Sequence, residues 1–200
     1  MNKVTYLIVA LILLAAGSAF ATSPVYEVYV NTSAIAGQSG YLDFQFNPGM
    51  SSQAALARIL NFDPYTGALT GVPLTTGDVA GGLPGAVTIN NTTAWNDYYQ
   101  GFTFGNGLHF SVQLEGPAVT APTDADGSSF GFSMYAADQV TPLLGKDSNG
   151  FAMTAEVTSL GTIATEYGPA ASSVPEPSTY ALFTLGLAGA VLLRKKTVKM

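Results

Sequence analysis

Apolar and polar residues alternate with a period of two in several segments of the middle of the chain. In residues 41–47, Leu42, Phe44 and Phe46 fall on one face, and polar side chains fall on the other. The same alternation occurs in residues 108–115, 129–135 and 151–157, and residues 25–31 and 85–90 have the composition of further strands. Each such strand would bury one face, because alternate residues point to opposite sides of a sheet. The pattern therefore predicts an all-β fold, an antiparallel β-sandwich of the jelly-roll-like type.

Turn-forming sequences separate these segments, as expected for many short strands. They are NPG at 47–49, DPYTG at 63–67, TTGD at 75–78, GGLPG at 81–85, DADG at 124–127 and KDSNG at 146–150. No repeat or linker divides this part of the chain, so residues 22–166 are predicted to form one β-sandwich domain. The secondary structure of residues 51–60 is not decided by the sequence, because helix propensity favours a capped helical turn and the surrounding strands favour a strand.

The first 21 residues have the composition of a secretory signal peptide. Lys3 provides a positive charge, an apolar stretch from Val4 to Ala16 follows, and Ala19 and Ala21 are the small residues that a signal peptidase requires. A transmembrane anchor is the alternative, but the apolar stretch is too short to cross a hydrocarbon core about 30 Å thick. The sequence predicts an N-terminal signal helix, residues 1–21, that is cleaved after Ala21.

The C-terminal end joins a linker, predicted for residues 167–173, to an apolar run and a basic tail. Residues 178–193 carry no charge, and a helix over this range would be about 24 Å long at 1.5 Å per residue. That length is somewhat short for a membrane, and an amphipathic or buried helix is the alternative. The run has no polar stripe, however, and Arg194, Lys195 and Lys196 follow it directly. This order favours a single transmembrane helix at 178–193, whose basic tail, residues 194–200, stays in the cytoplasm.

These C-terminal residues resemble the PEP-CTERM sorting signal of exported bacterial proteins. The resemblance covers residues 174–200 and rests on the apolar run, the three cations and a motif formed by Val174, Pro175, Glu176, Pro177, Ser178 and Thr179. It implies recognition by an exosortase, a membrane-embedded peptidase that removes the tail near the motif, in Gram-negative hosts that make exopolysaccharide. A permanent membrane anchor is the alternative. The middle of the chain, with GYLDFQFNPG, LPGAVTIN, NDYYQGFTFG and TPLLG, resembles a group of PEP-CTERM proteins of unknown function.

The charge is unevenly distributed along the chain. Residues 27–166 contain twelve carboxylates and only two cations, Arg58 and Lys146, which gives a net charge of about −10. Such a surface repels nucleic acid and anionic lipid, and it suits a neutral or cation-bridged partner. The chain has no cysteine, which excludes disulfides, thiolate metal sites and a cysteine nucleophile.

No convincing catalytic residues emerge from the motifs. GSSFG at 127–131 places Ser129 in a G-x-S-x-G motif, but it runs into an alternating strand, and the single histidine, His109, lies on the polar face of another strand. TDADGSS begins like a calcium loop with Asp124 and Asp126, yet Tyr135 stands where an EF-hand has its glutamate. A less regular calcium site stays open against an Asp-Gly hairpin turn. Otherwise no cofactor and no metal is expected.

The polar-aromatic stretch at 90–107 contains the candidate ligand contacts. Trp95, Tyr98 and Tyr99 could offer flat rings to sugars, with amide and carboxylate groups beside them, although core packing is the alternative. We expect an exported, non-catalytic protein of the envelope or biofilm matrix that associates with exopolysaccharide. A structural or protein-binding surface protein, permanently anchored, is the second hypothesis. An enzyme acting on envelope glycans is the weakest.

Overall fold

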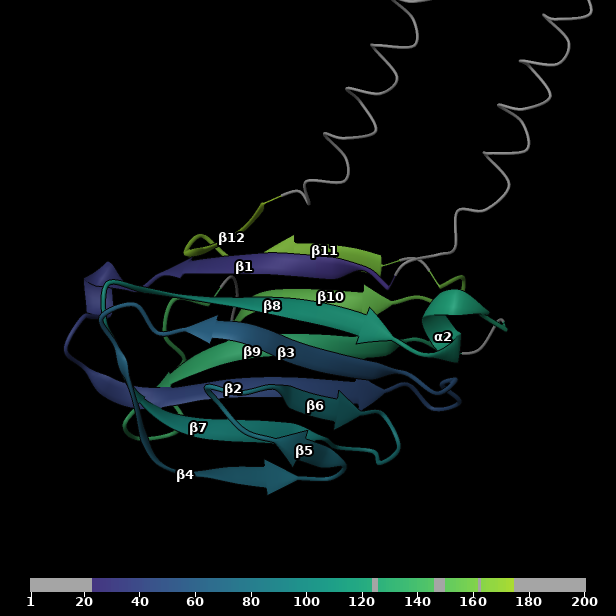
Figure 1. The fold of residues 1–200 in the computed structure, drawn as a ribbon, viewed down its shortest axis with the longest axis horizontal. Helices are drawn as coiled ribbons and strands as arrows, with labels where there is room; N and C mark the ends of the chain where they lie inside the picture. Colours follow the sequence, from purple (N-terminus) through teal and green to yellow (C-terminus); the bar gives the residue numbers. More distant parts are fainter. Residues whose placement is uncertain (1–22, 124–125, 146–149, 162, 175–200) are drawn as a thin grey trace, which may run out of the picture.

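The protein folds into two antiparallel sheets that face each other, seen in a computed structural model that describes residues 23–123, 126–145, 150–161 and 163–174 (Figure 1). The first sheet contains, in spatial order, β12 (Ala171–Val174), β1 (Val25–Asn31), β8 (Gly107–Glu115), β3 (Leu56–Asp63), β6 (Val87–Asn90) and β5 (Val79–Gly81). The second contains β11 (Ile163–Tyr167), β10 (Phe151–Val157), β9 (Ser128–Ala136), β2 (Ser39–Pro48), β7 (Asp97–Thr103) and β4 (Ala68–Thr76). The predicted all-β sandwich is confirmed.

Only two short helical segments occur in the described part of the chain, η2 (Ser33–Ile35) and α2 (Pro117–Thr120). Among the described residues, no helix is long and apolar enough to cross a membrane. The predicted signal helix (1–21) and transmembrane helix (178–193) lie outside the described residues, as does the basic tail.

The core lies between the sheets and contains the apolar faces that the alternation predicts. Leu42, Phe44 and Phe46 of β2 are fully buried, and so are the apolar residues of β8 and β9, namely Leu108, Phe110, Val112, Leu114, Phe130, Phe132 and Met134. The ring of Phe44 packs 4.8 Å from that of Phe132 in its own sheet and 5.2 Å from that of Phe110 in the opposite sheet, measured between centroids. Aromatic packing therefore joins the central strands of the two sheets.

Strand β10 departs from the expected alternation at its first residue. A bulge between Phe151 and Met153 shifts the register with β9, so Ala152 and Met153 are both buried. Phe151, which the alternation placed in the core, is instead partly exposed, and its ring occupies the space that a side chain at Gly131 would fill. The alternation is confirmed for Met153, Ala155 and Val157.

Strand pairing decides the secondary structure of two segments, residues 51–60 and residues 167–173. Of residues 51–60, the part from Leu56 onward is strand β3, because Ala57 and Ile59 enter the core while β6 and β8 pair with its two edges. Residues 167–173 are not a linker: Tyr167 ends β11, and β12 pairs with β1 from Val30↔Ala171 to Glu27↔Val174. A turn at 168–171 returns the chain, with the Ala171 N–H donating to the Gly168 carbonyl. The sandwich therefore includes residues 171–174.

Replacing Phe44 with Ala should lower the free energy of unfolding by about 3–5 kcal/mol, because it leaves a cavity at the contact between the sheets. Urea denaturation, followed by circular dichroism, measures the change. Val72→Ala is the control: its side chain is 87% exposed, so the free energy of unfolding should change by less than about 0.5 kcal/mol. Similar losses in the two variants would contradict the assigned core.

Candidate functional site

The predicted patch of Trp95, Tyr98 and Tyr99 does not form one surface. Tyr98 and Tyr99 are neighbours in β7, so their side chains must point to opposite faces of the second sheet. Tyr98 is fully buried in the core, where its hydroxyl accepts a hydrogen bond from the Leu83 N–H and donates to Gln100 Oε1. Burial also raises its pKa. The prediction is therefore wrong for Tyr98, whereas Tyr99 faces outward and Trp95 is 52% exposed.

Ser129 and His109 are also separated by the fold. Ser129 points outward from β9 in the second sheet, and His109 points outward from β8 in the first. The two side chains thus lie on opposite outer faces of the sandwich, since their neighbours Phe130 and Phe110 both enter the core. They cannot act as a nucleophile and its base in this arrangement.

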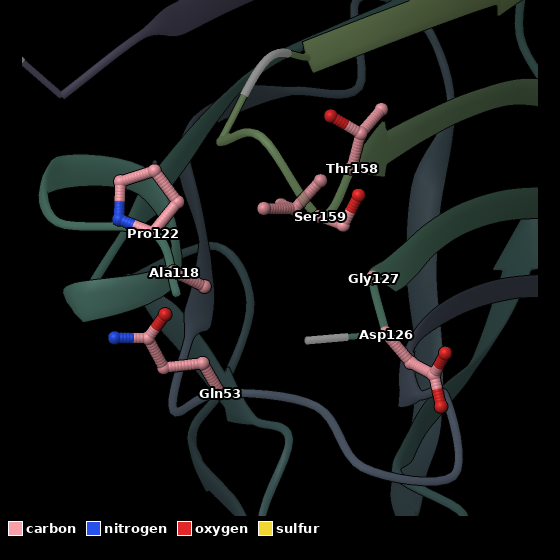
Figure 2. Close-up of a pocket in the computed structure, with 8 residues that line it drawn as sticks. Gln53, Ala118, Pro122, Asp126, Gly127, Thr158 and Ser159 are labelled. Atoms are coloured by element: carbon pink, nitrogen blue, oxygen red, sulfur yellow. The ribbon is translucent and has the colours of Figure 1, made fainter. Parts of the chain in front are cut away.

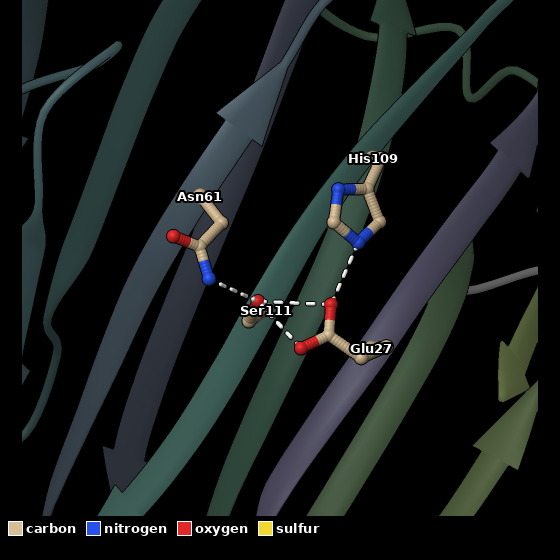
Figure 3. Close-up of polar contacts among 4 residues, drawn as sticks. All are labelled: Glu27, Asn61, His109 and Ser111. Atoms are coloured by element: carbon tan, nitrogen blue, oxygen red, sulfur yellow. Dashed lines mark hydrogen bonds and ion pairs between the residues drawn. The ribbon is translucent and has the colours of Figure 1, made fainter. Parts of the chain in front are cut away.

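The histidine instead belongs to a polar network on the outer face of the first sheet (Figure 3). Glu27 of β1 lies between two neighbours on β8: its Oε2 is 2.7 Å from His109 Nε2, and its carboxylate accepts from Ser111 Oγ at 2.9 and 3.0 Å. Asn61 Nδ2 donates to the same Ser111 hydroxyl at 3.0 Å. The serine donates its proton to the carboxylate rather than to the imidazole, so the order of groups is not that of a catalytic triad.

The candidate calcium ligand Asp126 holds a loop instead. Its Oδ2 accepts hydrogen bonds from the backbone N–H and the hydroxyl of Ser51, both at 3.0 Å, while Asp124 lies outside the described residues. The adjacent pocket, between Gln53, Pro122 and Ser159, has a volume of about 10 Å³, enough for one water molecule (Figure 2). The Gln53 amide at its rim is already bonded to Ala121 and Thr123. This pocket is too small for a sugar.

A larger cleft opens at one end of the first sheet, between β1, β8 and the turn after β3. Its volume is about 400 Å³, and it is lined mainly by Tyr29, Asn31, Tyr65, Thr66, Asn106 and Gly107. This turn is the one that the sequence predicted at residues 63–67. The Tyr65 N–H donates to Asp63 Oδ1 at 2.8 Å, and the Gly67 N–H donates to the Pro64 carbonyl. The tyrosine rings stay accessible, at 37% exposure for Tyr29 and 55% for Tyr65.

The two rings of this cleft have different neighbours. Tyr29 stacks on His109 with 4.4 Å between ring centroids, which connects the cleft to the network around Glu27. The Tyr65 ring lies beside Gly107, with its Cδ2 3.4 Å from the position that a Cβ would take there, which is ordinary packing distance. The cleft thus combines two oriented aromatic faces with the amide groups of Asn31 and Asn106.

The outer face of the second sheet has a different chemistry, centred on two adjacent carboxyl groups. Asp43 of β2 is 3% exposed and lies beside Asp97 of β7. Burial is the main cause that raises the pKa of Asp43 to about 8, and the Asp97 carboxyl adds to the rise. Burial also raises the pKa of Asp97.

Three tyrosines surround this carboxyl pair. The rings of Tyr41 and Tyr99 stack with centroids 4.8 Å apart and an angle of 15° between their planes, and Tyr135 lies 6.2 Å from Tyr99. Burial and the neighbouring carboxyl groups raise the pKa of Tyr99 above its usual range, so its hydroxyl stays neutral. The pair and the three tyrosines thus form one cluster on the outer face of this sheet, in which burial raises the pKa of both acids.

Sequence reasoning missed both outer-face clusters, although some signals were present. The alternation put Asp43 on the polar face of its strand, and the polar positions of an antiparallel sheet are usually solvated. The pairing of β2 with β7, which brings Asp97 next to it, joins residues more than fifty positions apart. The turn motif at 63–67 indicated where Tyr65 would lie, but nothing in the sequence indicated that Tyr29 faces the same cleft.

Comparison with known proteins identifies the C-terminal segment. Residues 173–196 match the family described as the PEP-CTERM protein-sorting motif. The chain therefore carries a PEP-CTERM sorting signal, which confirms the resemblance of residues 174–200. The signal implies processing by an exosortase and export to the cell envelope or extracellular space. Neither the curated proteins nor the solved structures include a significant match to the chain.

The stability of the domain should fall as pH rises from about 4 to 8 in buffer containing EDTA. Folded Asp43 keeps its proton up to about pH 8, whereas an unfolded aspartate loses it near pH 4. The folded state binds more protons between these values, so the free energy of unfolding decreases with pH. The groups facing Asp43 are Asp97, Tyr41, Tyr99 and Tyr135.

Thermal denaturation at a series of pH values measures this dependence. In the Asp43→Asn variant, the Tm should depend less on pH than in the native chain. Glu156→Gln removes an exposed carboxylate from β10 of the same sheet, and this variant should keep the native pH dependence of the Tm. A native-like slope in the Asp43→Asn variant would show that another group is responsible.

Proposed function

We propose that the protein is a non-catalytic, exopolysaccharide-associated protein of the cell envelope or extracellular matrix, and that the cleft between Tyr29 and Tyr65 binds the glycan. The observation that carries this proposal is the pair of accessible tyrosine rings beside two asparagines. Pyranose rings expose flat patches of C–H groups that pack on aromatic faces, and their hydroxyls need donors and acceptors such as amides. A volume of about 400 Å³ is in the range of small-ligand sites.

The charge of the domain favours a neutral glycan or one bridged by cations. Among the described residues Arg58 is the only lysine or arginine, and its guanidinium lies 3.7 Å from Glu115. No cation therefore lines the cleft, whose polar side chains are hydroxyls and amides. A free anionic polymer would be repelled by the excess of carboxylates in the chain, whose net charge is −6.

The arrangement of polar groups supports a binding role rather than a catalytic one. Glycoside hydrolysis needs two carboxyl groups about 5–10 Å apart, with room for the sugar or water between them. Asp43 and Asp97 touch each other, and Glu27 is bonded to Ser111 and His109. Neither set has the spacing or order that a glycosidase or a serine hydrolase requires.

A structural or protein-binding role is the second candidate, and strand β4 favours it. This strand is the last in its sheet, and it exposes Val72 and, at 65%, Leu74. An exposed apolar edge strand is a site where another chain can pair. Pro73 and the positive φ of Gly71 interrupt its regular hydrogen bonding, however, which limits such pairing.

Tyr65→Ala and Tyr29→Ala should each weaken binding to the polysaccharide extracted from the host by about tenfold, since each removes an aromatic face worth roughly 1.5 kcal/mol. Sedimentation of the full-length chain with the polysaccharide measures the affinity. Trp95→Ala is the matched control, because Trp95 is a similarly exposed aromatic residue that does not line the cleft. Loss of binding in the Trp95 variant alone would move the site to the stretch that the sequence suggested.

Replacing Pro175 and Pro177 together with Ala should keep the tail on the protein. The prolines favour the extended backbone that a peptidase binds, and the alanines would allow a helix to continue through the motif. Mass spectrometry of the envelope and released fractions should show a shortened native protein and an unshortened variant. A native protein that keeps its complete tail would instead support the permanent anchor.

A further inference from the structure

His109 lies beside the cleft, between the two strands that carry its tyrosine rings into place. Strand register places Tyr29 of β1 directly opposite His109 on one side and Asp63 of β3 directly opposite it on the other. Opposed residues of antiparallel strands point to the same face, so all three side chains lie on the outer face of the first sheet. The His109 side chain is only 17% exposed, although it lies on an outer face.

On the β1 side, the imidazole packs directly against one tyrosine of the cleft. Its ring and that of Tyr29 are stacked, with centroids 4.4 Å apart and an angle of 30° between their planes. The Nε2 atom of the imidazole lies 2.7 Å from Glu27 Oε2, and the Glu27 carboxylate also accepts from the buried Ser111 (Figure 3). A hydrogen-bonded imidazole thus supports the Tyr29 ring, which stays accessible to a ligand.

On the β3 side, Asp63 supports the backbone conformation of the other tyrosine. Tyr65 has a φ of 47°, in the left-handed region that a bulky side chain rarely adopts. Its N–H donates to Asp63 Oδ1 at 2.8 Å, which forms an Asx turn around this conformation. Such conformations persist only where surrounding contacts require them, and they are concentrated at functional sites.

A bulge in β3 brings Asp63 opposite His109. The register of β3 with β8 shifts between Leu60 and Asp63, and Asn61 accommodates the extra residue with a φ of 54°. Phe62, the next residue, is buried in the core. Because alternate residues of a strand point to opposite faces, burial of Phe62 turns Asp63 outward, directly before the turn that contains the second tyrosine.

We propose that His109 and Asp63 are positioning residues of the glycan cleft: His109 supports the ring of Tyr29, and Asp63 holds Tyr65 in its left-handed conformation. Because the cleft is the proposed glycan site, this role depends on the proposed function. Neither residue is among those that line the cleft, so each acts through a tyrosine. Rings that are already oriented lose less conformational freedom when a sugar packs on them, and this strengthens binding.

Sedimentation of the full-length chain with polysaccharide extracted from the host, in nonionic detergent, tests the role of His109. His109→Ala should weaken binding about three- to tenfold, the range that corresponds to one aromatic pair. His109→Phe keeps a ring that can stack on Tyr29 and should retain the native affinity, whereas His109→Gln keeps a polar group but no ring and should bind weakly. In a Tyr29→Ala background, His109→Ala should cause no further loss, since the ring that it supports is absent.

Two substitutions of Asp63 separate its hydrogen bond from its charge. Asp63→Ala removes the acceptor of the Tyr65 N–H and should weaken binding several-fold, whereas Asp63→Asn keeps an oxygen acceptor and should bind like the native chain. Asp138→Ala is the matched control. Asp138 Oδ1 accepts from the Val140 N–H in another exposed turn, where Gln139 has a φ of 64°, and this turn does not line the cleft. Its affinity should stay native.

The outcomes distinguish the positioning role from the proposed function. Native affinity in His109→Ala and Asp63→Ala, together with weak binding by Tyr29→Ala, would overturn the positioning role and leave the cleft as the binding site. Equal affinities in the native chain and both tyrosine variants would overturn the proposed function and, with it, the positioning role.

Two further results would also contradict support of the Tyr29 ring by His109. They are a failure of His109→Phe to bind better than His109→Gln, and an additional loss when His109→Ala is combined with Tyr29→Ala. Circular dichroism establishes that each variant is folded. If His109→Ala does not fold, the comparison of His109→Phe with His109→Gln provides the same test.

Discussion

The packing of Phe44 against Phe110 and Phe132 is the interaction on which the rest of the structure depends. It joins the central strand of one sheet to a central strand of the other, in a chain without disulfides. It also fixes orientation: once Phe44 faces the core, the period of two forces Asp43 and Gln45 outward. The polar chemistry of the second sheet is thus a direct consequence of core packing.

The two outer faces of the sandwich differ because their polar residues meet different neighbours. On the first sheet, Glu27 finds donors on both sides and its network is satisfied. On the second, Asp43 meets the carboxyl group of Asp97 beside three tyrosines, and burial raises its pKa to about 8. A carboxyl group is thus hydrogen-bonded to neighbouring side chains on one face, while on the other burial and a second carboxyl group raise its pKa.

The sorting signal and the sandwich have separate physical roles. The signal at 173–196 overlaps the sandwich only at its first residues, where β12 pairs with β1. Strand β12 pairs with β1 up to Val174, the residue directly before Pro175 of the motif. Because the sorting signal depends on a short local sequence, it can be joined to a domain whose surface has a different function.

Local sequence determined those features that depend on neighbouring residues alone. The strong alternation at 41–47, 108–115 and 129–135 predicted three buried faces correctly, and Val174–Thr179 followed by an apolar run and cations indicated the sorting signal. Tertiary structure alone decided the rest. Pairing with β6 and β8 made residues 56–60 a strand, pairing with β1 made 171–174 part of the sheet, and β7 turned Tyr98 inward. The Asp43–Asp97 and Tyr29–Tyr65 pairs were beyond prediction, because each joins distant segments through strand order, which periodicity does not encode.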